Sequence, residues 1–175
     1  LVENSEEGAL ENITGVITLQ FGDDSRQVTA NMPLNLLPAG RSLPLVAYFQ
    51  PPIPGDYSIS AQVEFLLPVM PGHQRYLDVA IQNQEILLAE EDETAEVTGE
   101  LRIAEDQPDA QYLWLAATAF DVEGSVVAIR RWEYPSSASA GDKIPFELTL
   151  YSMSGAIARV DVMVEALAVP ATPSE

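Results

Sequence analysis

The sequence is poor in the side chains that most enzymes and metal sites use. It contains no cysteine, one histidine (His73) and one lysine (Lys143). The absence of thiols excludes disulfide bonds, thiolate metal sites and cysteine nucleophiles. The single imidazole has no second histidine with which to share a metal and no Gly-x-Ser-x-Gly elbow to serve as a base. We therefore expect no catalytic residue, no metal site and no cofactor, and we predict that His73 is an exposed linker residue.

Basic residues and long apolar runs are also scarce. Eight Lys and Arg accompany 27 Asp and Glu, which gives a formal net charge of −19. Binding to phosphate backbones or to anionic lipid surfaces needs clustered positive charge, so the composition argues against nucleic acid and membrane-surface partners. No apolar run approaches the roughly 20 residues that span a bilayer, and we expect no membrane insertion of this fragment. The acidity is interpreted as solvating charge.

Carboxylates gather at two predicted turns. Residues 90–93 are four consecutive acidic residues, and their mutual repulsion favours an exposed turn rather than a packed element. Asp121 and Glu123 lie near the tip of a predicted hairpin, whereas glycosidase chemistry needs two carboxylates that face each other across a gap. We interpret both groups as solvated charge. For Asp121 and Glu123 the alternative is pairing with Arg130 or Arg131 across the hairpin, and for residues 90–93, as for Asp23 and Asp24, it is a weak Ca²⁺ site.

Alternation of apolar and polar residues runs through most of the chain, and no stretch sustains a helical period. In residues 57–67, for example, Tyr57, Ile59 and Val63 share one face and polar residues the other, which predicts a sheet with one wet side. Short strands separated by turn signals predict an all-β protein of antiparallel sandwiches. The expected strands are 16–21, 26–32, 43–49, 57–67, 76–81, 85–89, 96–104, 111–120, 125–134, 144–151 and 158–167.

One segment of the first half recurs in the second. Residues 39–45 (AGRSLPL) correspond to residues 140–146 (AGDKIPF), 101 positions later, and the register holds without a gap for about 20 residues more. Upstream, residues 13–16 resemble residues 97–100. Weak self-similarity at a fixed spacing indicates two copies of one module.

The repeat and the Pro/Gly-rich segment 68–74 together suggest a domain boundary. We predict two tandem Ig-like β-sandwich domains, at residues 1–74 and 75–168. A Pro/Thr/Ser tail at residues 169–175 has the composition of an extended linker. Because residue 1 is leucine, we expect the chain to be a fragment of a larger protein.

Residues 117–127 (ATAFDVEGSVV) resemble the aromatic–Asp–x–x–Gly hairpin of the FxLYD-type Ig-like domains of bacterial surface proteins. Residues 140–148 resemble the Gly-then-Pro-Phe strand that follows in those domains and in cell-adhesion-type Ig modules. The resemblance covers about residues 94–168, with Ala117 in place of the family's first aromatic residue and Phe120 in place of its Tyr. It implies an extracytoplasmic Ig-like sandwich with a spacer or binding role and no catalytic site.

We therefore expect a non-enzymatic structural or protein-interaction module of an extracytoplasmic surface protein, bacterial or archaeal. The alternative is a carbohydrate-binding module, which would need a set of exposed aromatic rings. The expected partner is another surface protein or a glycan. The candidate partner surface consists of Tyr48 and Phe49, before a proline-rich loop, and of Trp132 and Tyr134, on a polar strand. Trp114 lies in an apolar strand and is expected in the core.

Overall fold

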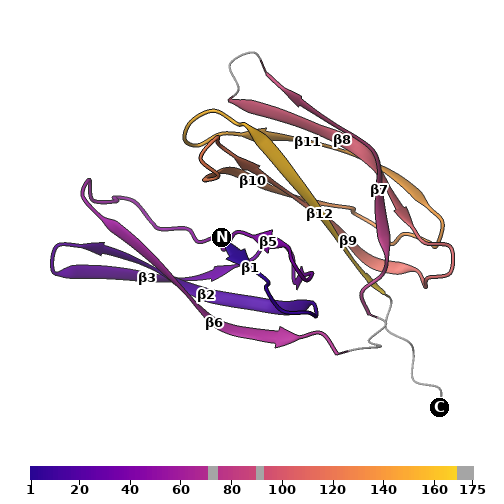
Figure 1. Ribbon diagram of the computed structural model, residues 1–175, viewed down its shortest axis with the longest axis horizontal. Helices are drawn as coiled ribbons and strands as arrows, with labels where there is room; N and C mark the ends of the chain where they lie inside the picture. The colour runs from indigo at the N-terminus through magenta and orange to yellow at the C-terminus, as the bar shows by residue number, and fades with distance from the viewer. Residues whose placement is uncertain (71–74, 90–92, 169–175) are drawn as a thin grey trace. The chain divides into compact units, whose positions relative to one another are not determined.

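The computed structural model describes residues 1–70, 75–89 and 93–168 (Figure 1). The chain divides into two compact units, Leu1–Met70 and Pro71–Glu175, called unit 1 and unit 2 below. Every strand pair is antiparallel, and the described residues contain no α-helix, so none of them forms a helix able to cross a membrane. The all-β prediction is confirmed. His73, residues 90–92 of the acidic run and the tail 169–175 lie outside the described residues.

Unit 2 contains two three-stranded sheets whose apolar faces pack on one core. One sheet has the order β11-β8-β7 and the other the order β10-β9-β12. The chain changes sheet between β8 and β9, between β10 and β11, and between β11 and β12. The strands are β7 (Val79–Leu88), β8 (Thr94–Ile103), β9 (Ala110–Phe120), β10 (Val126–Glu133), β11 (Lys143–Tyr151) and β12 (Arg159–Ala168).

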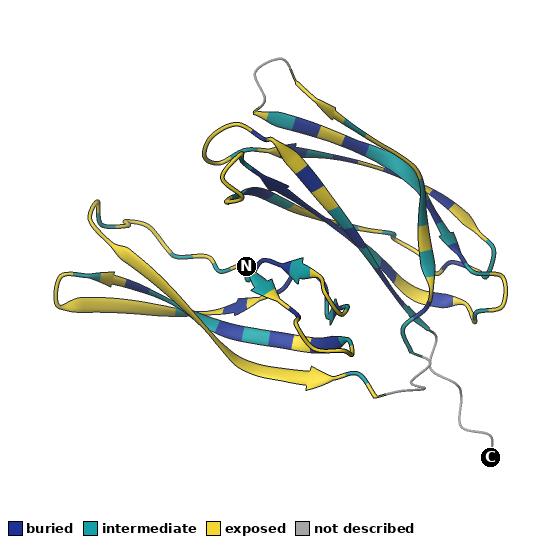
Figure 2. Ribbon diagram, in the orientation of Figure 1, coloured by how far each residue is buried: buried dark blue, intermediate teal, exposed yellow. Residues whose placement is uncertain are grey.

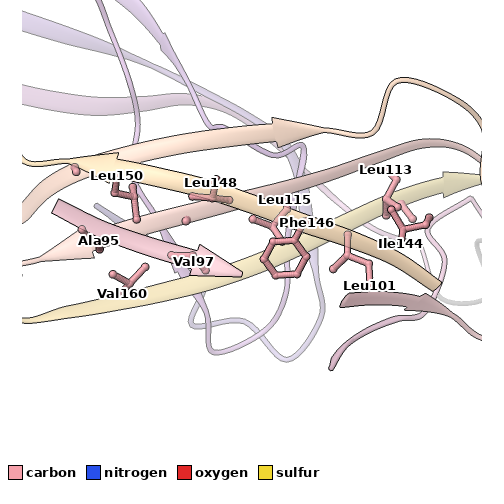
Figure 3. Packing of buried hydrophobic residues seen from close by; sticks show 14 of the residues in the cluster. Ala95, Val97, Leu101, Leu113, Leu115, Ile144, Phe146, Leu148, Leu150 and Val160 are labelled. Atoms are coloured by element: carbon pink, nitrogen blue, oxygen red, sulfur yellow. The ribbon is translucent and has the colours of Figure 1, made fainter. Parts of the chain in front are cut away.

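Alternate residues of these strands build the core of unit 2 (Figure 3). Val97 and Leu101 of β8 and Phe146 of β11 come from one sheet, and Leu115 of β9 and Val160 of β12 come from the other. All five are buried. Successive side chains of a strand point to opposite faces, so this alternation is what the period of two in the sequence predicts. The arrangement is sandwich-like.

Gly99 is required by the packing of Phe146. The two residues are cross-strand partners on β8 and β11. A Cβ atom at position 99 would lie 2.7 Å from Cζ of the Phe146 ring, closer than carbon atoms approach in proteins. Glycine therefore makes room for the ring within the sheet.

Unit 1 is built around one long strand. β2 (Leu10–Phe21) pairs with β3 (Asp24–Asn31) on one edge and with β6 (Ser58–Pro68) on the other. The two-residue strand β4 (Leu36–Leu37) pairs with the start of β2. β1 (Val2–Glu3) and β5 (Ser42–Leu43) form a separate two-stranded ribbon. Three of the six strands of unit 1 thus have only two residues each, whereas every described strand of unit 2 has at least eight.

The predicted strand at residues 43–49 is largely absent. Only Ser42–Leu43 is a strand, and Val46 makes an isolated bridge to Asn31. The physical reason is that this segment has no long strand to pair with. The corresponding strand of unit 2, β11, pairs residue by residue with β8, whereas β5 has only the two residues of β1 beside it. A segment without a ladder partner does not form a regular strand.

The prediction of one wet and one buried side for residues 57–67 is wrong. Strand β6 does form, but all of its residues are exposed, and Figure 2 shows it in one colour from end to end. Ile59, expected in a core, is 61% exposed. Alternation assigns residues to a face, but burial also requires something to cover that face, and this part of the sheet is uncovered.

The predicted segments 76–81 and 85–89 prove to be mostly one strand, β7. Its pairing with β8 shifts between Gln82 and Glu85, and Asn83 between them has a positive φ of 50°. Such a shift is a bulge, which bends a strand without ending it. Tyr76 lies outside β7 and bridges Leu167 of β12.

Candidate functional site

A groove of about 640 Å³ in unit 1 brings together Tyr48, Phe49 and Arg26. One wall is the edge strand β3, and the other is the proline-rich segment that follows Val46. Tyr48 is 76% exposed and Phe49 is half-buried. Aromatic side chains beside an arginine are the residues that dominate protein-binding surfaces.

Arg26 fixes the shape of this groove. Its Nη1 donates hydrogen bonds to the carbonyl oxygens of Gln50, at 3.2 Å, and of Pro52, at 3.0 Å. Its guanidinium carbon lies 5.5 Å from the centre of the Phe21 ring. The side chain therefore ties the proline-rich segment to β3 and holds it beside the edge of the sheet.

Trp132 and Tyr134 lie in unit 2 and are half-buried. Trp132 is the cross-strand partner of Leu115, so it belongs to the core-facing side of β10. The centre of its ring lies 6.1 Å from that of Tyr134, with 28° between the ring planes, and 6.2 Å from that of Phe146. Trp132 and Tyr134 pack against the core of unit 2. The four predicted surface residues thus form two pairs, one in each unit.

An aromatic group that the sequence reasoning missed lies on the other face of the same sheet. Trp114, predicted in the core, points away from the side of Leu113 and Leu115, because neighbours in a strand face opposite ways. Its ring lies 5.6 Å from that of Tyr112, and the guanidinium carbon of Arg131 lies 5.1 Å from its centre. The spacing of Tyr112, Trp114 and Arg131 on a hairpin could have indicated this group.

Asp121 builds the hairpin turn that the sequence predicts. Its Oδ1 accepts hydrogen bonds from the backbone amides of Glu123, at 2.9 Å, and of Ser125, at 2.8 Å. Gly124 supplies the positive φ, 84°. These bonds organise the turn itself, which is the usual role of an aspartate at this position.

Pairing with an arginine is the alternative to solvation for this turn, and each of the two arginines has a partner elsewhere. Arg131 pairs with Glu133, two residues along its own strand. Nη1 of Arg130 instead donates to the carbonyl oxygen of Thr149, at 2.8 Å. Both arginines therefore bind partners away from the turn, and the carboxylate of Asp121 satisfies backbone amides.

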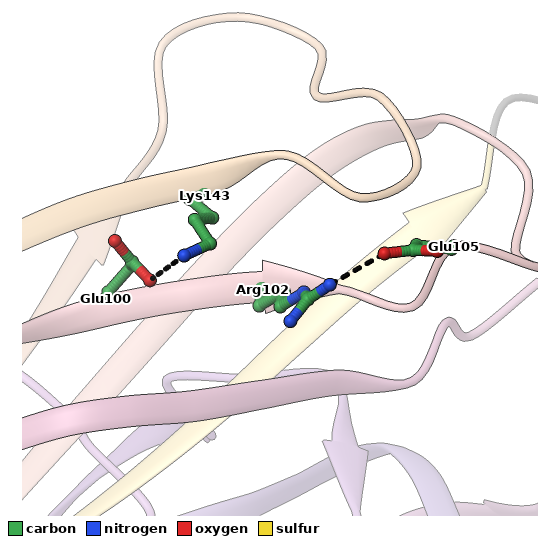
Figure 4. Close-up of polar contacts among 4 residues, drawn as sticks. All are labelled: Glu100, Arg102, Glu105 and Lys143. Carbon is green, nitrogen blue, oxygen red and sulfur yellow. Dashed lines mark hydrogen bonds and ion pairs between the residues drawn. The ribbon is translucent and has the colours of Figure 1, made fainter.

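A shallow hollow of about 440 Å³ lies beside β7 and β8, and one of the two ion pairs of this region lines it. Arg102 donates to Glu105 at 2.7 Å, and Nζ of Lys143 lies 3.7 Å from Oε1 of Glu100 (Figure 4). Arg102 and Glu105 line the hollow together with Asp78. The side chains of Arg102, Glu105 and Lys143 are exposed, and exposed ion pairs contribute little to stability.

One tyrosine has a shifted ionisation. Burial, and then the negative charge of Glu165, raise the pKa of Tyr76 above its ordinary 10.0, while nearby Arg75 lowers it. The hydroxyl is therefore kept in its neutral form to a higher pH than in water. Within residues 1–70, 75–89 and 93–168, no three His, Cys, Asp or Glu side chains come close enough to hold a metal ion.

Comparison of the chain with protein-family models, with curated proteins and with solved structures finds no match. The geometry of the groove and of the aromatic groups is therefore the basis on which a function can be argued.

Proposed function

We propose that the chain is a non-enzymatic structural or protein-interaction module of an extracytoplasmic surface protein, composed of two Ig-like sandwiches. The observation that carries the interaction role is the groove of unit 1, where exposed Tyr48 stands beside Phe49 and Arg26. An exposed aromatic ring that becomes buried on binding contributes a large part of the binding free energy. The sheet arrangement of unit 2, with crossings between two three-stranded sheets, supports the Ig-like part of the proposal.

The groove suits an extended peptide segment of a protein partner. The edge of β3 forms one wall and offers backbone groups, and Phe49 adds an apolar surface. Arg26 already uses Nη1 on the proline-rich segment, so the groove keeps its shape when empty. A preformed groove loses little conformational entropy when it binds.

Selection of a phage-displayed peptide library on the immobilised chain tests this role. We expect the enriched peptides to lose at least tenfold in affinity for the Tyr48→Ala variant. Tyr151→Ala is the matched control, because Tyr151 is also exposed but lies in unit 2. Peptides that bind both variants equally well, or no enrichment at all, would argue against the groove as an interaction site.

The second candidate function is carbohydrate binding, and the pair Tyr112–Trp114 is the observation that favours it. Sugar rings stack on aromatic faces, and Arg131 beside Trp114 could donate to hydroxyl groups. A glycan array separates the two candidates: binding that Trp114→Ala removes and Tyr48→Ala preserves would favour the carbohydrate module. We expect no such binding.

A further inference from the structure

The outer edge of β3, which borders the Tyr48 groove, presents backbone groups in a regular order. Asn31 exchanges two hydrogen bonds with Val46 at this edge, donating from its amide at 3.1 Å and accepting at its carbonyl oxygen at 2.9 Å. The backbone groups of Asn31 therefore point away from β2. Successive residues of a strand turn these groups to opposite edges, so those of Thr29 and Gln27 point the same way. The pairing of β3 with β2 has no register shift that would break this alternation.

The chain after Val46 leaves this edge instead of continuing along it. An antiparallel continuation would bring Tyr48 opposite Thr29, yet no hydrogen bond joins the backbones of these two residues in the described parts of the chain. Further along, it would bring Pro52 opposite Ser25, and proline has no N–H to donate to a ladder. The groove of about 640 Å³ lies where this pairing is missing.

Arg26 holds the departing segment at a distance from the backbone of β3. Its Nη1 donates to the carbonyl oxygens of Gln50 and Pro52, so a side chain rather than a ladder joins the segment to the strand. The backbone groups of Gln27 and Thr29 thus have no hydrogen-bond partner among residues 1–70, 75–89 and 93–168. An unpaired edge beside a second wall is the geometry in which an extended segment adds a strand to a sheet.

The face of β3 that lines the groove favours an apolar side chain in such a segment. Residues directly opposite each other in a ladder carry their side chains on the same face of the sheet. A residue opposite Val28 would therefore place its side chain in the groove, which Val28 and Phe49 line. Residues opposite Gln27 and Thr29 would place theirs on the other face, where both of these side chains are exposed. The favoured pattern is polar, apolar, polar.

We propose that the groove binds its partner's segment as an added β-strand, which exchanges backbone hydrogen bonds with Gln27 and Thr29 and places an apolar side chain opposite Val28. The segment belongs to a partner protein, is extended and has a backbone N–H at both positions that face β3. It stops short of Asn31, whose backbone groups are already bonded. This inference rests on the proposed function, because it takes the Tyr48 groove as the binding site, and adds the binding mode and the preferred sequence.

Two other occupants are disfavoured. A second copy of the chain carries the same net charge of −19, so two copies repel each other. The neighbouring segment of the chain itself, residues 47–52, ends in two adjacent prolines and is already bonded through Arg26. A segment of a partner protein has neither restriction.

Methylation of peptide nitrogens tests the strand mode. The probe is a synthetic copy of a peptide enriched by phage selection on the full chain, and each of its backbone amides is methylated in turn, which removes a donor. Alternate residues of an added strand face β3, so we expect methylation at two alternate positions to weaken binding by roughly tenfold or more. Methylation at the position between them should have a much smaller effect. Isothermal titration calorimetry measures the affinities.

A change in β3 tests the other side of the ladder. Gln27→Pro removes one outward amide and should weaken binding of the unmethylated peptide by roughly tenfold or more, since edge strands tolerate proline at such positions. Ala61→Pro is the matched control on β6, the opposite edge of the same sheet. The amide of Ala61 also points outward, because its partner Ile17 bonds to Val28 of β3. The control should bind the peptide as the unmodified chain does.

Hydrogen exchange on the unmodified chain gives a readout that does not depend on the folding of a variant. The bound peptide should slow exchange of the Gln27 and Thr29 amides by roughly tenfold or more and leave the amides of β6 unchanged.

Losses that do not alternate along the peptide, or no slowing at Gln27 and Thr29, would overturn the strand mode and leave the groove as the binding site. No enriched peptide, or peptides that bind Tyr48→Ala as tightly, would overturn this inference together with the proposed function. Protection of the two amides in the chain alone would show that the edge is already filled, by a second copy if dilution removes the protection and by the chain itself if it does not.

Discussion

Truncation of Val160 should destabilise unit 2 more than truncation of Ile59 destabilises unit 1. This is the reverse of what side-chain size suggests, because isoleucine is larger than valine. Deleting a buried methylene costs about 0.8 kcal/mol. Val160→Ala removes two carbons from a residue 8% exposed, which costs about 1.5 kcal/mol before any cavity cost. Ile59→Ala removes three carbons, but at 61% exposure the cost is only about 0.9 kcal/mol. Both changes lose the same kind of β-branched residue from a strand, so propensity largely cancels in the comparison.

Native-state hydrogen exchange is the suitable assay, because both tryptophans lie in unit 2 and fluorescence would not report on unit 1. A change of about 1.4 kcal/mol alters the exchange rate of globally protected amides tenfold. We expect Val160→Ala to accelerate exchange in β9 and β12 by at least tenfold and Ile59→Ala to accelerate it in β2 by less than fivefold. A larger effect from Ile59→Ala would refute the reasoning, since Ile59 would then be buried in solution.

Three further predictions concern single residues. Asn4→Ala should destabilise unit 1 by about 1–3 kcal/mol, measured by the same exchange, because Nδ2 of the buried Asn4 donates to two backbone carbonyl oxygens. The free energy of unfolding should fall as pH rises above 10, because Tyr76 ionises there in the unfolded chain but stays neutral in the folded protein, where its pKa is raised. Urea titrations at alkaline pH should show a smaller loss for Tyr76→Phe. Gly15→Ala should lower the melting temperature of unit 1, because its Cβ would clash with the backbone oxygen of Gln62 in β6, and Gly8→Ala, whose Cβ meets no atom within 4 Å, should not.

The strands of unit 2 are readable from the sequence because each has a partner on the appropriate edge and a cover on its apolar face. The predicted range 144–151 differs from the observed Lys143–Tyr151 by one residue, and 158–167 differs from Arg159–Ala168 by one at each end. In such strands local propensity, alternation and tertiary pairing agree.

The errors arise where a property depends on a residue far away in the sequence. Alternation placed Ile59 on an apolar face, but it contains no information about whether a second layer covers that face. The segment after Leu43 has the composition of a strand, yet it lacks a ladder partner. Trp114 was assigned to the core from its apolar neighbours, although neighbours in a strand point the opposite way. For the candidate groove, the sequence indicated Tyr48 and Phe49 but not Arg26, because a contact across β3 leaves no local pattern.

The exposed edge of β6 has a consequence for the colloidal behaviour of the protein. Among the described residues β6 pairs only with β2, and Glu64 is its only charged side chain, so its outer edge has few of the features that keep sheet edges apart. Long-range repulsion from the net charge of −19 then has to keep molecules separated. Salt shortens the range of that repulsion to about 10 Å at 0.1 M, and acid removes it near the isoelectric point of about 4.1. Solutions at low ionic strength and neutral pH should therefore remain clear longest, and fibrillar precipitate should appear first in concentrated salt or near pH 4.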